Sequence, residues 1–172
     1  MYISVNIETR SGDKLFFRKA AETDVDAMLA LQARSVSSAT FAAITREEML
    51  ESIERDLLIV ATCEGEIAAL GQIVTNRETE RSLAPDLGVP FSEVVTFDGV
   101  IVAPEHRGNG LQRIFLGMAE EFGGECGAAY VAATVAEANL PSRRNFGARG
   151  FSELKIIPKY GSERILVAKR IK

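Results

Sequence analysis

The sequence is poor in the side chains that most often bind metals. It contains one histidine, His106, and two cysteines, Cys63 and Cys126, which lie far apart in the chain. Zinc sites usually show ligand spacings such as CxxC or HExxH, and neither motif is present. We therefore expect no metal site. A catalytic Ser-His-Asp triad would have to run through His106 alone.

The sequence also lacks long apolar runs and an excess of basic residues. No apolar run approaches the roughly 18 residues of a membrane-spanning helix, and the first residues do not resemble a secretory signal. The net charge of −4 provides no broad basic field for nucleic acid. We expect a cytoplasmic protein without a nucleic-acid or membrane partner, whose mild negative field favours small cationic substrates.

What the sequence does contain is an alternation of short strands and amphipathic helices. Its length of 172 residues suits a single domain over 1–172, with residues 1–13 as an N-terminal strand extension. Residues 76–90 hold charges and prolines, and we expect a surface excursion there. Period-two patterns, turn signals and caps, such as Thr45 with Glu48 three residues later, predict the remaining elements. Strands are expected over 2–9, 14–20, two arms of 56–75 joined at Glu64-Gly65, 129–136, 151–157 and 163–171; helices over 23–32, 45–55 and 142–149; and a strand, a glycine turn and a helix over 94–124.

The segment from Val100 to Arg113, VIVAPEHRGNGLQR, is the most informative stretch. An apolar strand runs into a proline and then into two glycines, Gly108 and Gly110, directly before a helix. Glycines allow positive φ and a close approach of the backbone to a ligand, and the first turn of a helix leaves amide groups unpaired. Together these features predict an anion-binding site, although a plain strand-to-helix connector has the same pattern.

Two phosphate-binding motifs compete for this loop. A Walker A loop requires GxxxxGK[ST], and no lysine and hydroxyl pair follows the glycines, so this motif is excluded. The Rossmann motif GxGxxG matches Gly108 and Gly110 but has Arg113 at its third glycine. No acidic residue lies near the end of the next strand to bind a ribose. A Rossmann-like nucleotide-binding protein therefore remains an alternative with the two glycines as its only support.

A third pattern, V-x-P-x-x-R-G-x-G-L, resembles motif A of the GNAT family of N-acetyltransferases. Arg107 and Gly110 match the first and fourth positions of that family's [Q/R]-x-x-G-x-[G/A], whereas Gln112 stands where a small residue is usual. Residues 17–31 resemble the family's first strand and helix, and residues 139–151 resemble its later N-x-x-[A/S]-x-x-[L/N]-Y-x-x-x-G-F segment. Two motifs in the right order, about thirty residues apart, are more specific than either one alone.

The resemblance implies an acyl-CoA N-acyltransferase fold and acetyl-CoA as cofactor. The fold is mixed α/β, with a central mixed, mostly antiparallel sheet of about six to eight strands and helices on both faces. By resemblance, the backbone of one strand binds the pantetheine arm, and the amides of the loop bind the pyrophosphate, which Arg107 and Arg113 help to neutralise. The cofactor-binding residues implied are Val100, Ile101, Val102, Arg107, Gly108, Asn109, Gly110, Leu111, Gln112, Arg113, Asn139 and Phe146.

Gly99 interrupts a β-branched strand, and the resemblance favours a β-bulge there over a packing glycine. Such a bulge separates two neighbouring strands and frees backbone groups for the pantetheine arm. Asn139 matches an asparagine of the family and is also suited to cap the next helix. Phe146 occupies the place of the family's thiolate-protonating tyrosine, and a phenylalanine has no proton to donate. Core packing is the alternative role for its ring.

The function implied is transfer of an acetyl group from acetyl-CoA to a primary amine of a small molecule or peptide by direct attack. An amine must lose a proton first, so we expect a carboxylate near the acceptor, with Asp98 as the first candidate and Glu93 and Glu137 as others. Tyr160 or water would protonate the thiolate. By resemblance, the acceptor site is built from 35–44, 76–94 and 158–164. A catalytically inactive, CoA-binding regulatory module is the alternative, and the resemblance also admits a homodimer.

Overall fold

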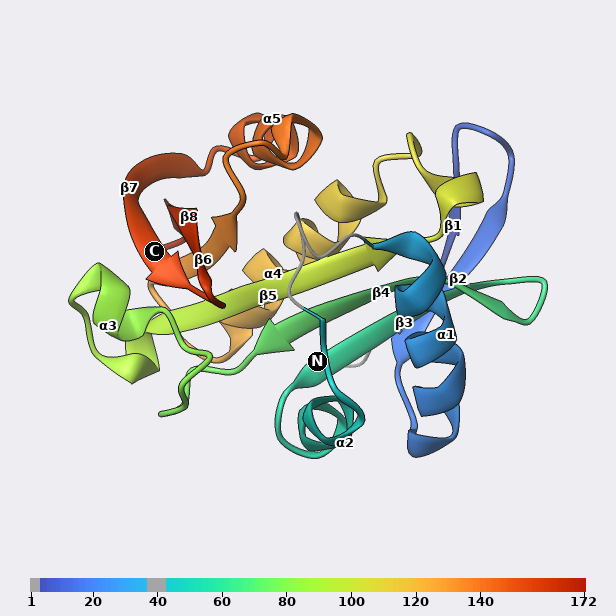
Figure 1. The fold of residues 1–172 in the computed structure, drawn as a ribbon, viewed down its shortest axis with the longest axis horizontal. Helices are drawn as coiled ribbons and strands as arrows, with labels where there is room; N and C mark the ends of the chain where they lie inside the picture. Colours follow the sequence, from blue (N-terminus) through green and yellow to red (C-terminus); the bar gives the residue numbers. More distant parts are fainter. Residues whose placement is uncertain (1–3, 37–42) are drawn as a thin grey trace.

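The protein is built on one eight-stranded sheet, seen in the computed structural model, which describes residues 4–36 and 43–172 (Figure 1). The strand order is β1-β2-β3-β4-β5-β6-β8-β7. Only the β5–β6 pair is parallel, and every other neighbouring pair is antiparallel. The expected mixed, mostly antiparallel sheet is thus confirmed, at the upper end of the expected strand number.

The elements follow the sequence patterns closely. Both hairpins near the N-terminus are formed, and the turn residues Glu64 and Gly65 have φ of 51° and 89°, as a two-residue hairpin requires. Thr45 caps α2 and Glu48 closes the capping box. The strands are β1 (Ser4–Glu8), β2 (Lys14–Lys19), β3 (Leu57–Cys63), β4 (Glu66–Val74), β5 (Val94–Val102), β6 (Tyr130–Val135), β7 (Ser152–Lys159) and β8 (Ser162–Arg170). The helices are α1 (Val25–Ser35), α2 (Arg46–Arg55), α3 (Ala84–Leu87), α4 (Leu111–Glu125) and α5 (Leu140–Ala148).

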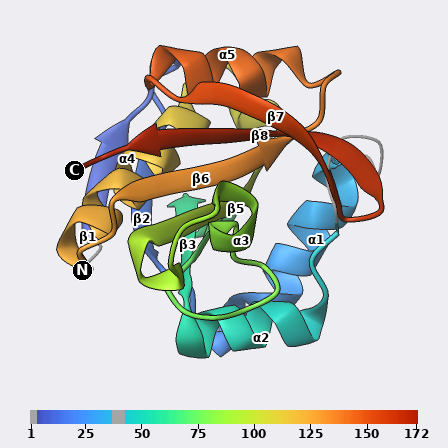
Figure 2. The ribbon, with the colours of Figure 1, turned by 90° about the vertical axis from the view of Figure 1, so that its left-hand side faces the viewer.

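Helices cover both faces of the sheet (Figures 1 and 2). Successive residues of a strand face opposite sides, so β3 shares its side chains between two cores. Leu58 and Val60 pack in one core with α1 and α2, whereas Ile59 packs in the other core with Phe115 of α4. Apolar contacts therefore bury the sheet on both sides. A polar side chain in the middle of the sheet is thus an exception.

The strands β5 and β6 separate along their length. They pair only from Val94 with Tyr130 to Phe97 with Ala133, although β5 continues to Val102 and β6 to Val135. Beyond Phe97, no residue of β5 pairs with a residue of β6. The sheet therefore opens toward the carboxyl end of β5, next to the loop that leads into α4 (Figure 1).

A β-bulge marks the point at which this separation begins. Ile73 of β4 pairs with Phe97 and Gln72 pairs with Gly99, so Asp98 is the extra residue between them. The bulge predicted at Gly99 is present, and it projects the neighbouring carboxylate. Bulges of this kind often redirect a side chain.

The segment 76–90 differs from its prediction as a surface excursion. It contains the short helix α3, and Ser82, Leu83 and Ala84 are buried. Leu83 and Ala84 pack with Val94 and with residues of β6, β7 and β8. The sequence did not reveal this packing, because only a few apolar residues make the contacts and they lie among charges and prolines.

Candidate functional site

The loop between β5 and α4 has the backbone conformation that its glycines predict. Gly108 and Gly110 have φ of 82° and 76°, and Gly110 is the N-cap of α4. The amide of Arg113 donates to the Gly110 carbonyl oxygen at 3.0 Å. Within the described residues, the amides from Gly108 to Gln112 donate to no protein acceptor. A helix N-terminus with unpaired amides favours an anion.

The side chains of this loop are mostly engaged with neighbouring elements. Arg107 was expected to face the anion, but its guanidinium donates to the carbonyl oxygens of Ser35 and Val102 and so joins the loop to the end of α1. Arg113 instead lies beside Gly110, with Nη2 3.2 Å from the place of a Cβ there. Arg113 is therefore the arginine of this loop that lies at the start of the helix.

The N-terminal hairpin supports the same loop. The amide of Ser11 donates to Oδ1 of Asn109 at 3.3 Å, and Nδ1 of His106 lies 3.0 Å from Oδ2 of Asp13. His106 is therefore paired with a carboxylate at the loop, and no serine is its partner among the described residues.

Three further residues of the predicted cofactor site lie on or beside α4 and α5. Gln112 accepts from Asn145 at 2.9 Å and donates to Ser142 at 2.7 Å, so it joins the two helices. Asn139 accepts from the amide of Ser142 at 3.2 Å and caps α5, as its residue type suggests. Phe146 is buried, and its ring packs edge-on against Phe97 and Phe151. The ring thus has the core-packing role that the sequence left as its alternative.

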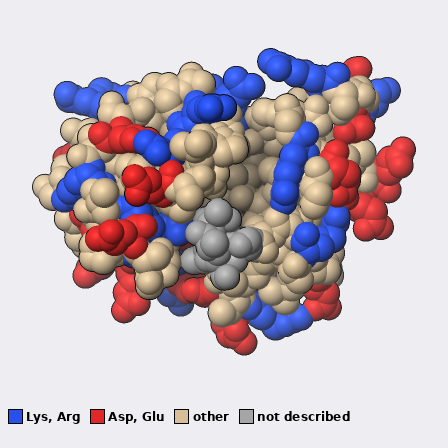
Figure 3. Space-filling view, turned by 45° about the horizontal axis from the view of Figure 1, so that its top comes forward, with Lys and Arg blue, Asp and Glu red and all other residues tan. Residues whose placement is uncertain are grey.

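An open groove runs along the start of α4 toward the end of α5. Asn109, Gly110, Arg113, Ile114 and Arg149 line it, together with Gly117 and Ala148. The guanidinium of Arg149 pairs with Glu120 at 2.7 Å. Figure 3 shows a hollow in the middle of the face that carries α5 and the loop, with basic and acidic side chains interspersed around it.

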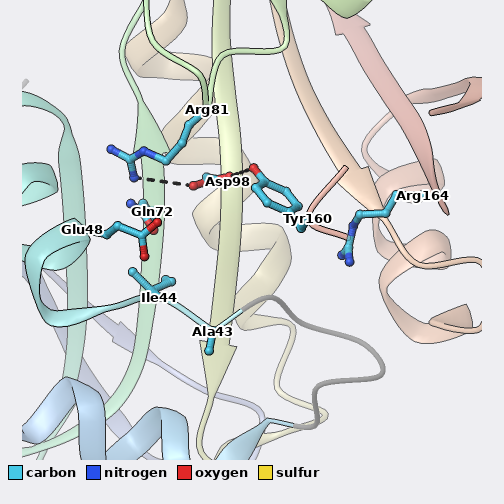
Figure 4. Close-up of a pocket in the computed structure, with 8 residues that line it drawn as sticks. All are labelled: Ala43, Ile44, Glu48, Gln72, Arg81, Asp98, Tyr160 and Arg164. Carbon is cyan, nitrogen blue, oxygen red and sulfur yellow. Dashed lines mark hydrogen bonds and ion pairs between the residues drawn. The ribbon is translucent and has the colours of Figure 1, made fainter. Parts of the chain in front are cut away.

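A separate small cavity of about 60 Å³ lies beside the bulge (Figure 4). It is formed where five parts of the chain meet: the start of α2, the middle of β4, the segment before α3, the bulge of β5 and the β7–β8 turn. Asp98 and Tyr160, the two catalytic candidates, both line it. The full lining consists of Ala43, Ile44, Glu48, Gln72, Arg81, Asp98, Tyr160 and Arg164.

Asp98 is not the solvated surface carboxylate that its sequence position also permitted. Only 10% of its side-chain surface is exposed, and its Oδ1 accepts a hydrogen bond of 2.5 Å from the hydroxyl of Tyr160. Burial raises the pKa of Asp98 above its ordinary value, although the bond from Tyr160 and the charge of Arg81 both act to lower the pKa. The other two carboxylate candidates, Glu93 and Glu137, do not line the cavity.

Tyr160 reaches Asp98 from an unusual backbone conformation. It occupies the first position of the two-residue β7–β8 turn with φ of 54°, where glycine, asparagine or aspartate is favoured. The residue is 41% exposed, but its hydroxyl points inward to Asp98 (Figure 4). Burial and the neighbouring carboxylate raise the pKa of Tyr160 far above its ordinary value, so the phenol stays neutral.

Arg81 connects Asp98 to a second buried carboxylate. Its Nη2 lies 2.5 Å from Oδ2 of Asp56, which is fully buried and also pairs with Arg77 at 3.0 Å. Its Nη1 lies 3.6 Å from Oδ2 of Asp98 and donates to Oγ of Ser52 at 3.0 Å. A buried charge requires such pairing, and the network fixes Arg81 beside the cavity.

Each of the three regions predicted for the acceptor contributes to the cavity, through Ile44, Arg81 and Tyr160 respectively. Residues 37–42 of the first region lie outside the described residues. Glu48 and Gln72 were missed by the sequence reasoning. Gln72 could have been found, because it is a polar residue in the middle of the mostly apolar strand β4. Glu48 could not, because its position in the capping box of α2 already accounts for a glutamate there.

Comparison with known proteins identifies the family. A model described as the acetyltransferase (GNAT) family matches residues 25–151. The chain belongs to this family. The family resemblance noted in the sequence is thus confirmed, and with it acetyl-CoA, the acetyl donor of GNAT acetyltransferases. No curated protein matches the chain by sequence.

Solved structures with acetyltransferase names share the fold. One is yncA from Salmonella typhimurium with its cofactor acetyl-CoA, with 18% identity, a TM-score of 0.71, and coverage of 92% of this chain and 94% of that one. The ribosomal-protein-alanine N-acetyltransferase from Brucella melitensis has 24% identity and a TM-score of 0.68, covering 90% and 98% of the two chains. A GNAT acetyltransferase from Streptococcus pneumoniae has 19% identity and a TM-score of 0.70, covering 92% and 99%. At these identities the similarity establishes the acyl-CoA N-acyltransferase fold.

The described residues contain neither a membrane-spanning helix nor a cluster of metal ligands. No helix among residues 4–36 and 43–172 has the length and apolar character needed to cross a membrane. The same part of the chain holds no cluster of three or more His, Cys, Asp or Glu side chains arranged to bind a metal ion.

Proposed function

We propose that this GNAT protein transfers the acetyl group of acetyl-CoA to a primary amine of a small molecule or peptide, with Asp98 as the general base. The observation that carries this proposal is the position of Asp98. Its buried carboxylate lies in the bulge of β5, where β5 and β6 separate, and it faces a cavity built from the three predicted acceptor regions.

The donor side of the site is formed mainly by backbone groups. The separated backbone of Val100 to Val102 would bind the pantetheine arm, and the unpaired amides from Gly108 to Gln112 would bind the pyrophosphate. Arg113 lies beside these amides to neutralise charge, and the groove along α4 continues from there. Acetyl-CoA, when bound, supplies a thioester carbon that a neutral amine attacks directly.

Asp98 meets the chemical requirement on the acceptor side. Most alkyl amines are protonated at neutral pH, because their pKa lies near that of lysine, about 10.4. An ammonium group has no lone pair for attack, so a base must remove a proton. Burial raises the pKa of Asp98, which makes its carboxylate a stronger base than an exposed aspartate.

Tyr160 holds the carboxylate and remains a neutral proton donor. Its hydroxyl donates to Asp98, and its raised pKa prevents ionisation near neutral pH. Tyr160, or water, would supply the proton that the departing thiolate requires, and Tyr160 would take back a proton from Asp98, which has accepted one from the amine. This assignment replaces the family tyrosine whose position Phe146 occupies.

The alternative of an inactive CoA-binding module rested on Phe146. No feature of the described structure supports that alternative, because a phenol and a buried carboxylate are present at the bulge.

Two measurements test the proposal. Calorimetry and thermal melting with acetyl-CoA should show binding, with stabilisation of roughly 2.7 kcal/mol at about 100 times the dissociation constant. A screen of amines, amino acids, polyamines, peptides and aminoglycosides, read by release of free thiol, should show acceptor-dependent turnover. Binding without turnover for any amine would contradict the enzymatic proposal and favour the regulatory module.

A further inference from the structure

Gln72 is a buried polar side chain of the cavity with an atom that has no partner. It lies in the middle of β4 and is 1% exposed. Its Oε1 makes no hydrogen bond, and only Ser35 Oγ shares this property among the buried side-chain atoms of the described residues. A buried acceptor without a partner lowers stability, and a ligand that donates to Gln72 Oε1 in the cavity would remove this cost.

The orientation of Gln72 is fixed by its other end. Its Nε2 donates to Oγ of Ser52 at 2.5 Å, and Arg81 donates to the same oxygen at 3.0 Å. Ser52 is completely buried on α2. The cross-strand neighbour of Gln72 is Gly99, which has no side chain to fill the space beside the amide. The carbonyl end of Gln72 therefore stays in the cavity (Figure 4).

The neighbours of Gln72 favour a ligand with positive charge and several N–H groups. Glu48 points its carboxylate into the cavity from α2, with Oε2 accepting from the Thr45 amide at 2.7 Å. Its charge acts to raise the pKa of Asp98, which places the two carboxylates within electrostatic reach of each other. Arg81, by contrast, is engaged with Asp56 and Ser52. Arg164, the second cation of the lining, donates through Nε to Oγ1 of Thr134 at 3.1 Å, so the oxygens of Gln72 and Glu48 are the acceptors on the α2 side of the cavity.

We infer that Gln72 Oε1 and the Glu48 carboxylate each accept one N–H of the acceptor nitrogen, which makes Gln72 a specificity-determining residue for unsubstituted primary amines. The inference rests on the proposed function, since it assigns the remaining proton to Asp98. A primary ammonium has three N–H groups, one for each of these oxygens. Once Asp98 has taken its proton, the two held N–H groups keep the lone pair on the side of the β5 bulge.

This arrangement discriminates against N-methylated amines. A secondary amine has one fewer N–H, so its methyl group would face either Gln72 or Glu48 and leave an oxygen buried without a partner. A site built to hydrogen-bond a group rejects the analogue that lacks it more strongly than an apolar pocket does. The cavity of about 60 Å³ exceeds the roughly 10–15 Å³ that one water needs, so it admits a compact amine head.

A binding experiment tests the inference without a known acceptor. In ¹⁵N-labelled protein saturated with CoA, methylammonium should shift the Gln72 side-chain amide resonance saturably, while tetramethylammonium at equal ionic strength should not. The resonance is assigned by its loss in Gln72→Met. Gln112, bonded to Ser142 and Asn145 away from the cavity, is the internal control and should not respond. Equal responses to both cations, or a saturable response to acetate instead, would overturn the inference.

Kinetics with matched acceptors separate this inference from the proposed function. We expect the wild type to prefer glycine over sarcosine, and n-propylamine over N-methylpropylamine, by at least tenfold in kcat/KM. Gln72→Met should reduce this preference to less than about threefold, mainly through a higher KM for the primary amine, with acetyl-CoA affinity unchanged. Gln72→Glu, which keeps an acceptor oxygen, should retain the preference.

The outcomes are distinguishable. Turnover of primary amines with an unchanged preference in Gln72→Met would refute the role of Gln72 and leave the proposed function standing. A methylammonium response without turnover of any amine would instead support the cation site and refute the proposed acetylation.

Discussion

The loop that follows β5 and the cavity at the bulge of β5 are constructed in different ways. The loop uses contiguous residues, two glycines with positive φ and the first turn of α4, and its binding groups are backbone amides. The cavity uses side chains from five segments that are separate in sequence, and its central groups, Asp98 and Arg81, are charged and mostly buried. The proposed donor site is thus a property of local backbone conformation, whereas the proposed acceptor site depends on tertiary packing.

This difference has a consequence for how each site responds to mutation. Side-chain changes in the loop leave the amides in place unless they alter the backbone, so most of them should be mild. Changes in the cavity remove a charge or a hydrogen bond from a buried network, and each should alter the ionisation of its neighbours. The following substitutions test this contrast.

The largest effect is expected for Asp98→Asn. We expect kcat/KM to fall by about 10²-fold or more, because general-base catalysis contributes typically 10²–10⁴-fold. The acidic limb of the wild-type pH profile should lie above the ordinary aspartate pKa of about 3.9 and should vanish in the variant. Acetyl-CoA affinity should be unchanged. Glu137→Gln, which alters an exposed carboxylate outside the cavity, is the control and should keep full activity.

The same variant makes a prediction about stability. Folding raises the pKa of Asp98, so the folded state binds the proton more tightly than the unfolded state does. The favourable contribution of the protonated form is present at low pH and is lost as pH rises through the raised pKa. Asparagine resembles the protonated form, so Asp98→Asn should not lower the melting temperature at pH 7. A marked decrease in the melting temperature would show that the attraction between ionised Asp98 and Arg81 is larger than the cost of burying the Asp98 charge.

Gly110→Val should affect the donor site alone. Valine resists the φ of 76° found at this position, and its Cβ would approach the Arg113 guanidinium at 3.2 Å. The loop should relax and lose its converging amides, so we expect acetyl-CoA affinity to fall by about 50-fold. Calorimetry and the melting temperature of the ligand-free protein provide the measurement.

Gly124→Ala is the matched control for that substitution. Gly124 lies on the same helix without a positive φ, and a Cβ there meets open space. The control should keep wild-type affinity. A loss of ligand-free stability in Gly110→Val as large as the loss of binding energy would instead identify the loop as a structural connector.

Arg81→Met tests how the charge network of the cavity sets the ionisation of Asp98. Its removal leaves Asp98 without the positive charge that lowers its pKa, so the acidic limb of kcat/KM should move to higher pH. We expect activity at pH 7 to fall roughly 20-fold and the melting temperature to fall as well, because Asp56 keeps only Arg77 as its cationic partner. An unchanged pH profile would contradict electrostatic coupling between Arg81 and Asp98.

Tyr160→Phe should have the smallest effect. Loss of the hydrogen bond to Asp98 should raise the pKa of the carboxylate and move the acidic limb upward, while acetyl-CoA affinity stays constant. We expect kcat/KM to fall by about tenfold, since one hydrogen bond to a charged group is worth roughly 1.5–3 kcal/mol and water replaces part of it. A decrease as large as that of Asp98→Asn would make Tyr160 the obligatory proton donor.

The sequence by itself determined the order of strands and helices and the loop after β5. Hairpins, caps and the glycine pair depend on residues a few positions apart, and their backbone preferences act locally. For this reason the turn at Glu64-Gly65, the cap at Thr45 and the positive φ of Gly108 and Gly110 all matched their predictions. The bulge near Gly99 was predicted with the help of family resemblance, but its extra residue was not.

Only the tertiary structure decided which side chains face the cavity. The sequence ranked Asp98 before Glu93 and Glu137 as the candidate base, but the register shift between β4 and β5 is what placed Asp98 alone beside Tyr160. The burial of Arg81, within a segment whose composition predicted a surface excursion, required the partner Asp56 from the end of α2. Burial and charge pairing depend on contacts between residues far apart in the chain: 25 residues separate Arg81 from Asp56, and 62 separate Tyr160 from Asp98. A local sequence pattern cannot predict such contacts, because the groups that stabilise a buried charge lie far from it in the sequence.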